Sequence, residues 1–232
     1  MTLVIGHKGA AGLARENSLV AFRAARRVGA DGVELDVRRT GDGALAVHHD
    51  PNLPDGRALL GLTADELPEG MVALPAVLDA CEGLALVNVE IKNWPLDPDY
   101  DESLGIAEAV VAALAARPDA ERDRYVVSCF HLETIDRMRE LAPDVVTGWL
   151  VGLVGPDDGA QVVAEAGRRG HRALHPHHGL VTSGLVERAH AAGLSVNAWT
   201  CNEPDRIRWL ADVGVDGIIT DVPDVALRAL GR

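Results

Sequence analysis

Short β-branched apolar runs alternate with longer segments of helical period along the whole chain. Each apolar run has the length and composition of a buried strand, and each longer segment, rich in Ala, Leu, Arg and Glu, has the spacing of an amphipathic helix. The predicted strands span residues 3–7, 32–36, 86–91, 126–130, 147–151, 173–176, 195–200 and 217–221. The predicted helices span residues 18–28, 75–81, 104–116, 132–141, 160–169, 183–192, 204–213 and 222–230.

This alternation predicts an α/β fold. Strands that alternate with helices form parallel sheets, and eight such pairs in 232 residues favour a closed (β/α)8 barrel. No Pro-, Gly- or Ser-rich linker interrupts the pattern. We therefore expect residues 1–232 to form one barrel domain.

A ninth apolar run, residues 44–48, follows the second strand too closely to leave room for a helix. It therefore predicts a β-hairpin. Asp42 and Gly43 form a strong two-residue turn signal. Centring the turn there predicts these cross-strand pairs: Arg38 with Val47, and Asp36 with His49.

Three carboxylates interrupt apolar strands near their carboxyl ends, where barrels of this kind carry their reactive groups. They are Glu34, Asp36 and Glu90. Converging carboxylates repel one another unless a cation lies between them, and oxygen ligands suit a hard divalent ion, Mg²⁺ or Ca²⁺. Three separate salt bridges are the alternative. Because the carboxylates lie within apolar strands, we favour the metal site.

The basic residues give a second clue. The chain has 20 arginines and only two lysines, Lys8 and Lys92, both at strand ends. A compact ammonium is a plausible partner for a phosphate oxygen. Pairing with a neighbouring carboxylate is the alternative, and it is more reasonable for Lys92, beside Glu90, than for Lys8.

Two of the nine histidines, His7 and His49, come from different strands toward the same rim. With ordinary pKa values near 6.5, they suit general acid and base catalysis on opposite sides of a phosphorus centre. Trp199 ends another strand, where it can stack over a ligand. A soft-metal site at His175, His177 and His178 is less favoured, because Pro176 and the adjacent placement spoil the ligand geometry.

The net charge and the cysteine content exclude several classes of partner and site. Lys and Arg total 22 against 35 Asp and Glu, a net charge of −13, which argues against nucleic acid and anionic membrane surfaces as partners. Three separated cysteines support neither a disulfide framework nor a thiolate zinc site. With no signal peptide or apolar span in the sequence, we expect a cytoplasmic protein without stable membrane association.

Short motifs occur along the chain in a characteristic order. They are His7-Lys8-Gly9, Glu16-Asn17, Glu34-Leu35-Asp36, Asp42-Gly43, His49-Asp50, Glu90-Ile91-Lys92, Ser128-Cys129-Phe130, Trp199-Thr200, and Gly217 to Asp221 with Pro223. In combination these motifs are highly specific, and they resemble those of the glycerophosphodiester phosphodiesterase family over essentially the whole chain.

The resemblance implies a TIM-type barrel that hydrolyses a small glycerophosphodiester to sn-glycerol 3-phosphate and an alcohol with the help of a divalent metal. It further implies that each candidate residue has a role. Glu34, Asp36 and Glu90 would hold the metal, His7 and His49 would be the acid/base pair, Lys8 and Lys92 would contact phosphate, and Trp199 would lie near the glycerol.

The sequence departs from the family at three places. Lys8 stands where Arg is usual, Arg15 stands where Pro is usual, and residues 51–57 replace a usually longer loop after His49-Asp50. Two alternative functions remain: hydrolysis of a lysophospholipid or another phosphodiester on the same barrel, and binding of phosphorylated metabolites without catalysis. The intact histidines and carboxylates argue against the binding role.

Overall fold

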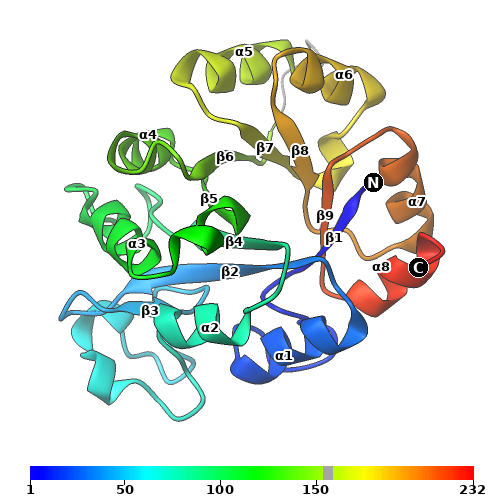
Figure 1. Cartoon of the computed structure of the whole chain (residues 1–232). Coiled ribbons are helices and arrows are strands. Elements are labelled where there is room, and N and C mark those ends of the chain that lie inside the picture. Colours follow the sequence, from blue (N-terminus) through cyan, green and yellow to red (C-terminus); the bar gives the residue numbers. More distant parts are fainter. Residues whose placement is uncertain (154–158) are drawn as a thin grey trace.

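Eight parallel strands form a closed barrel in the computed structural model, which describes residues 1–153 and 159–232 (Figure 1). Each strand pairs in parallel with its neighbours, and β1 pairs with both β9 and β2, which closes the ring. The predicted TIM-type (β/α)8 barrel is confirmed. Its strands are β1 (Leu3–Gly6), β2 (Gly32–Arg39), β4 (Leu86–Ile91), β5 (Tyr125–Cys129), β6 (Val146–Val151), β7 (Ala173–Pro176), β8 (Ser195–Ala198) and β9 (Gly217–Thr220).

The helices surround the barrel (Figure 1). Their ends lie within one residue of the predicted ends, and short 3-10 helices occur in the connections. The α-helices are α1 (Leu19–Val28), α2 (Leu74–Ala80), α3 (Gly105–Ala115), α4 (Leu132–Leu141), α5 (Ala160–Arg169), α6 (Ser183–Ala191), α7 (Pro204–Asp212) and α8 (Pro223–Ala229). The 3-10 helices are η1 (Leu59–Gly61), η2 (Ala64–Glu66), η3 (Asp119–Arg124) and η4 (His178–Leu180).

Helix α1 shows why these boundaries were readable from the sequence. The Ser18 side chain accepts a hydrogen bond from the Ala21 backbone N–H, which satisfies one free donor at the helix start. At the other end, Gly29 adopts the left-handed conformation, with φ at 87°, and its N–H bonds back to the last turn. Local capping interactions therefore mark both ends of α1.

The alternation along β2 points the candidate carboxylates into the barrel. Val33, Leu35 and Val37 are fully buried in the apolar layer between the sheet and the helices. Successive side chains on a strand point to opposite faces, so Glu34 and Asp36 face the barrel interior. The same strand thus supplies both core and site.

The predicted hairpin is present, but its predicted register is wrong by one residue. Strand β3 (Leu45–Val47) runs antiparallel to β2. The observed pairs are Arg39 with Leu45, Arg38 with Ala46 and Val37 with Val47, and the backbone of Asp36 contacts His48 rather than His49.

The loop length explains this correction. The Thr40 backbone N–H donates to the Ala44 carbonyl at 2.9 Å, so the loop contains three residues, 41–43, rather than two. Gly43, at φ 85°, takes the left-handed position that closes such a loop. The Thr40 hydroxyl also donates to Asp42 at 2.5 Å, which ties the loop to the strand end.

No helix in residues 1–153 and 159–232 is long and apolar enough to cross a membrane.

Candidate active site

A cavity of about 250 Å³ opens at the carboxyl ends of the barrel strands. Seven of the eight predicted site residues line it: His7, Lys8, Glu34, His49, Glu90, Lys92 and Trp199. The eighth, Asp36, is fully buried. A wider hollow of about 550 Å³ lies elsewhere, beside Met1 and Arg232, and none of the predicted residues lines it.

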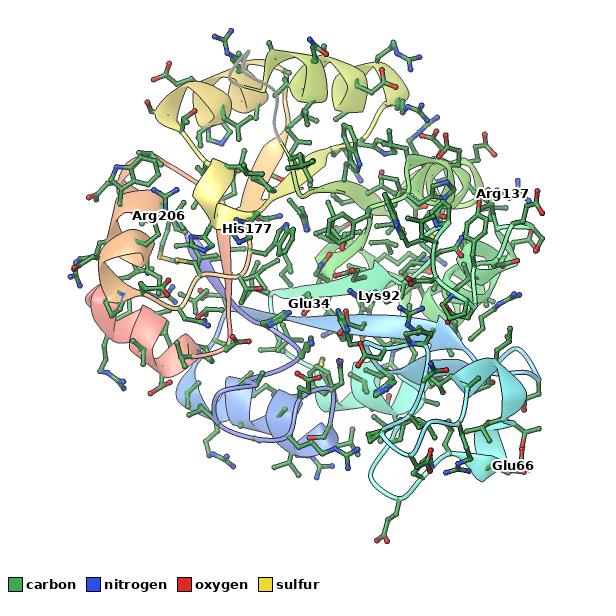
Figure 2. All side chains as sticks on the ribbon, turned by 180° about the vertical axis from the view of Figure 1, so that it is seen from behind. Glu34, Glu66, Lys92, Arg137, His177 and Arg206 are labelled. Carbon is green, nitrogen blue, oxygen red and sulfur yellow. The ribbon has the colours of Figure 1, made fainter. Side chains whose placement is uncertain are left out.

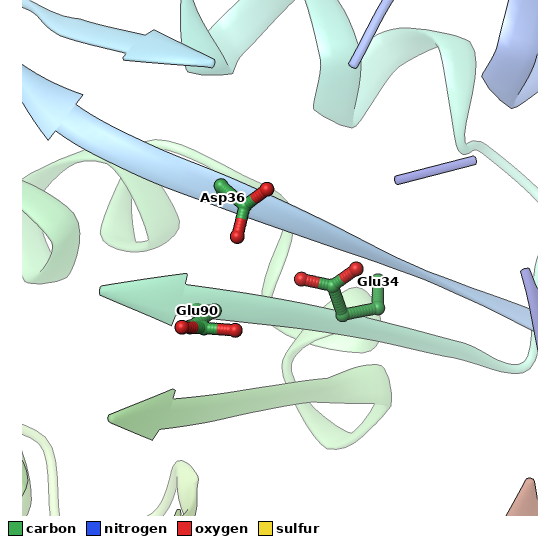
Figure 3. A group of neighbouring side chains, drawn as sticks. All are labelled: Glu34, Asp36 and Glu90. Carbon is green, nitrogen blue, oxygen red and sulfur yellow. The ribbon is translucent and has the colours of Figure 1, made fainter. Parts of the chain in front are cut away.

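The three predicted metal ligands form one cluster. Glu34 and Asp36 come from β2, and Glu90 comes from the neighbouring strand β4 (Figure 3). Parallel pairing places Asp36 beside Glu90, and one oxygen from each of the three carboxylates lies within 4.8 Å of the others. All three side chains are buried.

The pKa values of two of these carboxyl groups shift in opposite directions, although burial by itself raises both. For Glu34, burial and the negative charges of Asp36 and Glu90 raise the pKa to about 8. For Asp36, burial is outweighed by the positive charges of Lys92 and His49 and by a hydrogen bond from Asn17, so its pKa falls to about 2. Without a cation in the cluster, the Glu34 carboxyl group therefore loses its proton less readily than an ordinary glutamate does.

Both lysines make ion pairs. The Lys92 ammonium contacts a Glu90 oxygen and lies 3.0 Å from Asp36 Oδ1. Lys8 Nζ lies 3.2 Å from Glu16 Oε2. Carboxylate pairing, the alternative we considered for the lysines, is thus present at both. The three clustered carboxylates nevertheless do not form three separate salt bridges with the lysines. Lys92 contacts two of them, Asp36 and Glu90, and Glu34 pairs with neither lysine ammonium in the structure described.

Lys8 also contributes its backbone. The chain turns sharply after β1, with Lys8 in the left-handed region at φ 49°. In this conformation its backbone N–H donates to Glu34 Oε2 at 2.9 Å. The first loop of the barrel is therefore tied to the carboxylate cluster through the main chain.

His7 is held by Asp221, from the end of β9. His7 Nδ1 lies 2.6 Å from Asp221 Oδ1, and its Nε2 lies 3.8 Å from Glu34 Oε2. Burial lowers the pKa of His7, but the hydrogen bond to Asp221 and the negative charges of Glu34 and Asp36 outweigh it, so the pKa is raised. The other Asp221 oxygen accepts a 2.6 Å hydrogen bond from Asn202.

His49 is held in the same way. Its Nδ1 lies 2.7 Å from Asp50 Oδ1, and its backbone carbonyl accepts a 2.7 Å hydrogen bond from Arg38 Nε. A carboxylate at Nδ1 fixes the ring and its tautomer. In both histidines Nε2 is the ring nitrogen that does not contact the aspartate.

Several polar residues support the site although no sequence pattern indicated a role for them. Asn17 donates to Asp36 Oδ2 at 2.8 Å. Asn88 pairs in register with Glu34, lines the cavity and donates to the Ser128 hydroxyl at 3.0 Å. The sequence gives little indication of these roles. A lone Asn resembles an ordinary turn or strand residue, and Asp221 contacts His7 only because β1 and β9 pair when the barrel closes.

Aromatic rings form one wall of the cavity. Trp199 packs edge-on against Phe130, with ring centroids 5.5 Å apart, and its indole N–H donates to the His175 carbonyl at 2.6 Å. His177 also packs edge-on against Trp199 and lies away from Glu34 and Lys92 (Figure 2). His175 is buried, and desolvation lowers its pKa to about 4, so it is neutral at physiological pH.

The three-histidine metal site was not favoured, and His175 instead receives a hydrogen bond from Asn197 Nδ2 at 3.0 Å. Within the described ranges, the single group of three or more acidic, His or Cys side chains with metal-binding geometry is Glu34, Asp36 and Glu90. The cavity thus combines an acidic cluster, two anchored histidines and two ammonium groups.

Comparison with known proteins identifies the family of this chain. The sequence model of the glycerophosphoryl diester phosphodiesterase family matches residues 7–225. A glycerophosphodiester phosphodiesterase of Caldanaerobacter subterraneus is 31% identical over 253 aligned positions, which cover 100% of this chain and 98% of the relative. A relative of the same name from Bacillus altitudinis is 30% identical, with 98% of each chain covered.

Solved structures give the same result. The crystal structure of a putative glycerophosphoryl diester phosphodiesterase from Silicibacter pomeroyi has a TM-score of 0.87 at 28% identity and covers 99% of this chain and 93% of its own. An Oleispira antarctica phosphodiesterase, solved with the product sn-glycerol-3-phosphate, shares the fold, with a TM-score of 0.87 at 23% identity, and 100% and 98% of the two chains are covered. The chain therefore belongs to the glycerophosphoryl diester phosphodiesterase family of phosphodiester hydrolases.

Proposed function

We propose that this protein hydrolyses a small glycerophosphodiester to sn-glycerol 3-phosphate and an alcohol, with a divalent cation, Mg²⁺ or Ca²⁺, and with His7 and His49 as the acid/base pair. One observation carries the proposal. Two histidines, each anchored at Nδ1 by a carboxylate, border the same cavity as the buried acidic cluster.

The residues present fit a hard divalent cation. The donors are carboxylate oxygens, the ligands that Mg²⁺ and Ca²⁺ prefer. Glu34 Oε1 is buried and accepts no hydrogen bond within the described residues, so a cation would satisfy it. When bound by Glu34, Asp36 and Glu90, the cation would neutralise charge on the non-bridging phosphate oxygens.

The histidines move the protons. Water is consumed overall: one Nε2 removes a proton from the oxygen that bonds to phosphorus, and the other donates a proton to the alcohol oxygen as its bond to phosphorus breaks. Asp221 and Asp50 keep the two rings oriented, and Asp221 stabilises the imidazolium form of His7.

The remaining roles concern binding. Lys8 and Lys92 line the cavity and supply positive charge for the phosphate oxygens. Because the protein is acidic overall, such positive charge must come from local residues. Trp199, on the aromatic wall, offers a flat apolar surface for the glycerol carbons. We further propose a cytoplasmic location, which is compatible with three buried cysteines, Cys81, Cys129 and Cys201, that form no disulfide.

The test is phosphorus NMR of the purified protein with a mixture of glycerophosphodiesters, in Mg²⁺, in Ca²⁺ and in EDTA. We expect glycerol 3-phosphate to form only with metal, and the His7→Asn and His49→Asn variants to lose about 10²- to 10⁴-fold in kcat. His190→Asn is the matched control, because exposed His190 also bonds a carboxylate, Asp216, at 2.9 Å. Turnover in EDTA, or full activity in either variant, would contradict the proposal.

A further inference from the structure

Asn17 lies at the end of the loop that joins β1 to α1, directly before Ser18, the N-cap of the helix. It is 5% exposed, and its backbone N–H donates to the Lys8 carbonyl at 3.0 Å, which closes the base of the loop. The acid/base pair, the metal ligands and the substrate-binding residues proposed above do not include Asn17.

The backbone of Asn17 is strained. Its φ of 54° lies in the left-handed region, and only two other non-glycine residues in the described part of the chain, Lys8 and Leu104, have a positive φ. Asn enters this region more readily than most residues do, but such a conformation persists only where the surrounding contacts impose it. Strained positions are concentrated at functional sites, so the contacts of the Asn17 side chain deserve a functional explanation.

The side-chain amide of Asn17 contacts Asp36 at two points. Asn17 Nδ2 donates to Asp36 Oδ2 at 2.8 Å, and the Asp36 backbone N–H donates to Asn17 Oδ1 at 3.4 Å. Asp36 has no exposed surface, and Asn17 has almost none. The two hydrogen bonds therefore lie where water does not compete for the same atoms.

These bonds determine which oxygen of Asp36 faces the carboxylate cluster. Asp36 Oδ2 is bonded to Asn17, whereas Oδ1 lies 3.0 Å from Lys92 Nζ. The same ammonium contacts Glu90, so Oδ1 is the oxygen on the side of Glu90. Without the Asn17 amide, the carboxyl group would lose a bond that opposes its rotation about Cβ–Cγ.

The loop of residues 8–17 holds a second carboxylate of the cluster from its other end. There the Lys8 backbone N–H donates to Glu34 Oε2 at 2.9 Å. The two ends of one loop thus orient two of the three proposed metal ligands, one through the main chain and one through a side chain. A substitution at residue 17 removes the side-chain contact and keeps the main-chain contact.

We propose that Asn17 is a positioning residue for the divalent cation: it holds Asp36 Oδ2 so that Oδ1 is presented to the metal. This inference rests on the proposed function and deepens it, because it assigns part of the metal affinity to a residue outside the carboxylate cluster. Asn17 acts through Asp36, since it is not one of the described residues that line the active-site cavity. Hydrogen-bond partners of metal ligands typically contribute about 10- to 100-fold to metal affinity.

The test is calorimetric titration of the metal-free protein with Mg²⁺ and with Ca²⁺, without substrate. Asn17→Gly deletes the amide and keeps the backbone N–H, and glycine adopts a φ of 54° without strain, so the variant should fold. We expect the Kd of the cation to rise by about 10- to 100-fold.

Leu104→Gly is the matched control. Leu104 also has a left-handed backbone, with φ at 58°, and it lies at the start of α3, outside the carboxylate cluster. The same type of replacement there should leave the Kd of the cation unchanged. An equal rise of the Kd in both variants would assign the effect to the backbone and overturn the role of the Asn17 amide.

Kinetics separate positioning of the metal from a role in substrate binding. At low metal concentration Asn17→Gly should lose activity in proportion to its raised Kd. At saturating metal most of kcat should return, with an unchanged KM for the glycerophosphodiester. A KM that stays raised at saturating metal would overturn the proposal in favour of a direct contact with substrate.

The remaining outcomes distinguish this inference from the proposed function. A lower Tm of metal-free Asn17→Gly with an unchanged Kd would show a purely structural role, and it would leave the proposed function standing. If the unsubstituted protein binds neither cation, or hydrolyses the diester equally well in EDTA, the proposed function fails and the role of Asn17 fails with it.

Discussion

His7 and His49 come from different parts of the barrel, and each has a carboxylate at Nδ1. Asp50 is the next residue after His49, whereas Asp221 is 214 positions away from His7. The sequence showed both histidines and both aspartates, but only one of these pairings was local. The His7–Asp221 contact exists because β1 and β9 pair when the barrel closes.

Asp221→Asn tests this distant pairing. The Asn side chain has the same size but no charge, so the imidazolium of His7 loses its main stabilising partner. We expect kcat to fall by about 10²- to 10⁴-fold and the limb of the pH–rate profile that belongs to His7 to move to lower pH.

Asp205→Asn is the control, because Asp205 lies exposed on α7 and pairs only locally with Arg208. A purely structural role for Asp221 would predict a loss of stability with an unshifted pH profile. Unchanged activity and an unchanged profile would mean that the carboxylate is irrelevant to His7.

The hairpin of β2 and β3 shows how an element can be predicted correctly and still be misplaced. Asp42 and Gly43 gave the correct position of the turn, but the loop contains one residue more than the two-residue signal implied. A one-residue shift changes every cross-strand pair. His49 still lines the cavity: β3 ends at Val47, the His48 N–H makes one further bond to the Asp36 carbonyl, and His49 lies beyond the paired residues.

Gly43→Ala tests the loop geometry. At Gly43, φ is 85° and an added Cβ would meet nothing within 4 Å, so backbone strain alone should destabilise the variant, by about 1–2 kcal/mol. Gly61→Ala is matched to it: this exposed glycine also has open space around it but lacks a positive φ, and its change should stay within about 0.5 kcal/mol. Urea unfolding measures both. Equal losses would contradict the left-handed loop position.

At the scale of the whole molecule, the barrel brings buried like charges together. Glu34 has its pKa raised to about 8, so in the folded, metal-free protein it holds a proton that it loses when unfolded. The folded state then binds more protons than the unfolded state across the window from about 4.5 to about 8. Stability must fall as the pH rises through that window, and the raised pKa of His7 acts in the same direction.

This sets a prediction for metal-free protein. Its Tm in EDTA should fall as the pH rises from about 5 to about 8, and a loss of about 1 kcal/mol corresponds to roughly 2–4 °C in a domain of this size. The depressed pKa of Asp36, about 2, contributes stability that is lost only in strong acid, outside this range. Calorimetry at several pH values measures the trend.

Mg²⁺ or Ca²⁺ should raise the Tm most at the alkaline end of this pH range. There the cation displaces the Glu34 proton most readily, and the ionised carboxylate binds it best. Glu34→Gln removes the titrating group and should flatten the pH dependence in EDTA. An equally steep dependence in this variant would show that other groups cause it.

Local features were predictable from the sequence: the alternation of strands and helices, the ends of α1 at Ser18 and Gly29, and the residues of β2 that face inward. Each follows from periodicity or from contacts within a few residues. It also showed the candidate chemistry at the strand ends, because charged groups in apolar strands are conspicuous.

Which of these groups come into contact depends on the folded arrangement of the whole barrel. Strand pairing placed Asp36 beside Glu90, closure of the barrel brought Asp221 to His7, and the loop after β4 brought Trp94 to Phe130. The hairpin register likewise depended on hydrogen bonds of the loop that the turn residues did not reveal. The physical reason is common to all: distances between residues far apart in sequence are fixed by packing and pairing, which a local pattern does not encode.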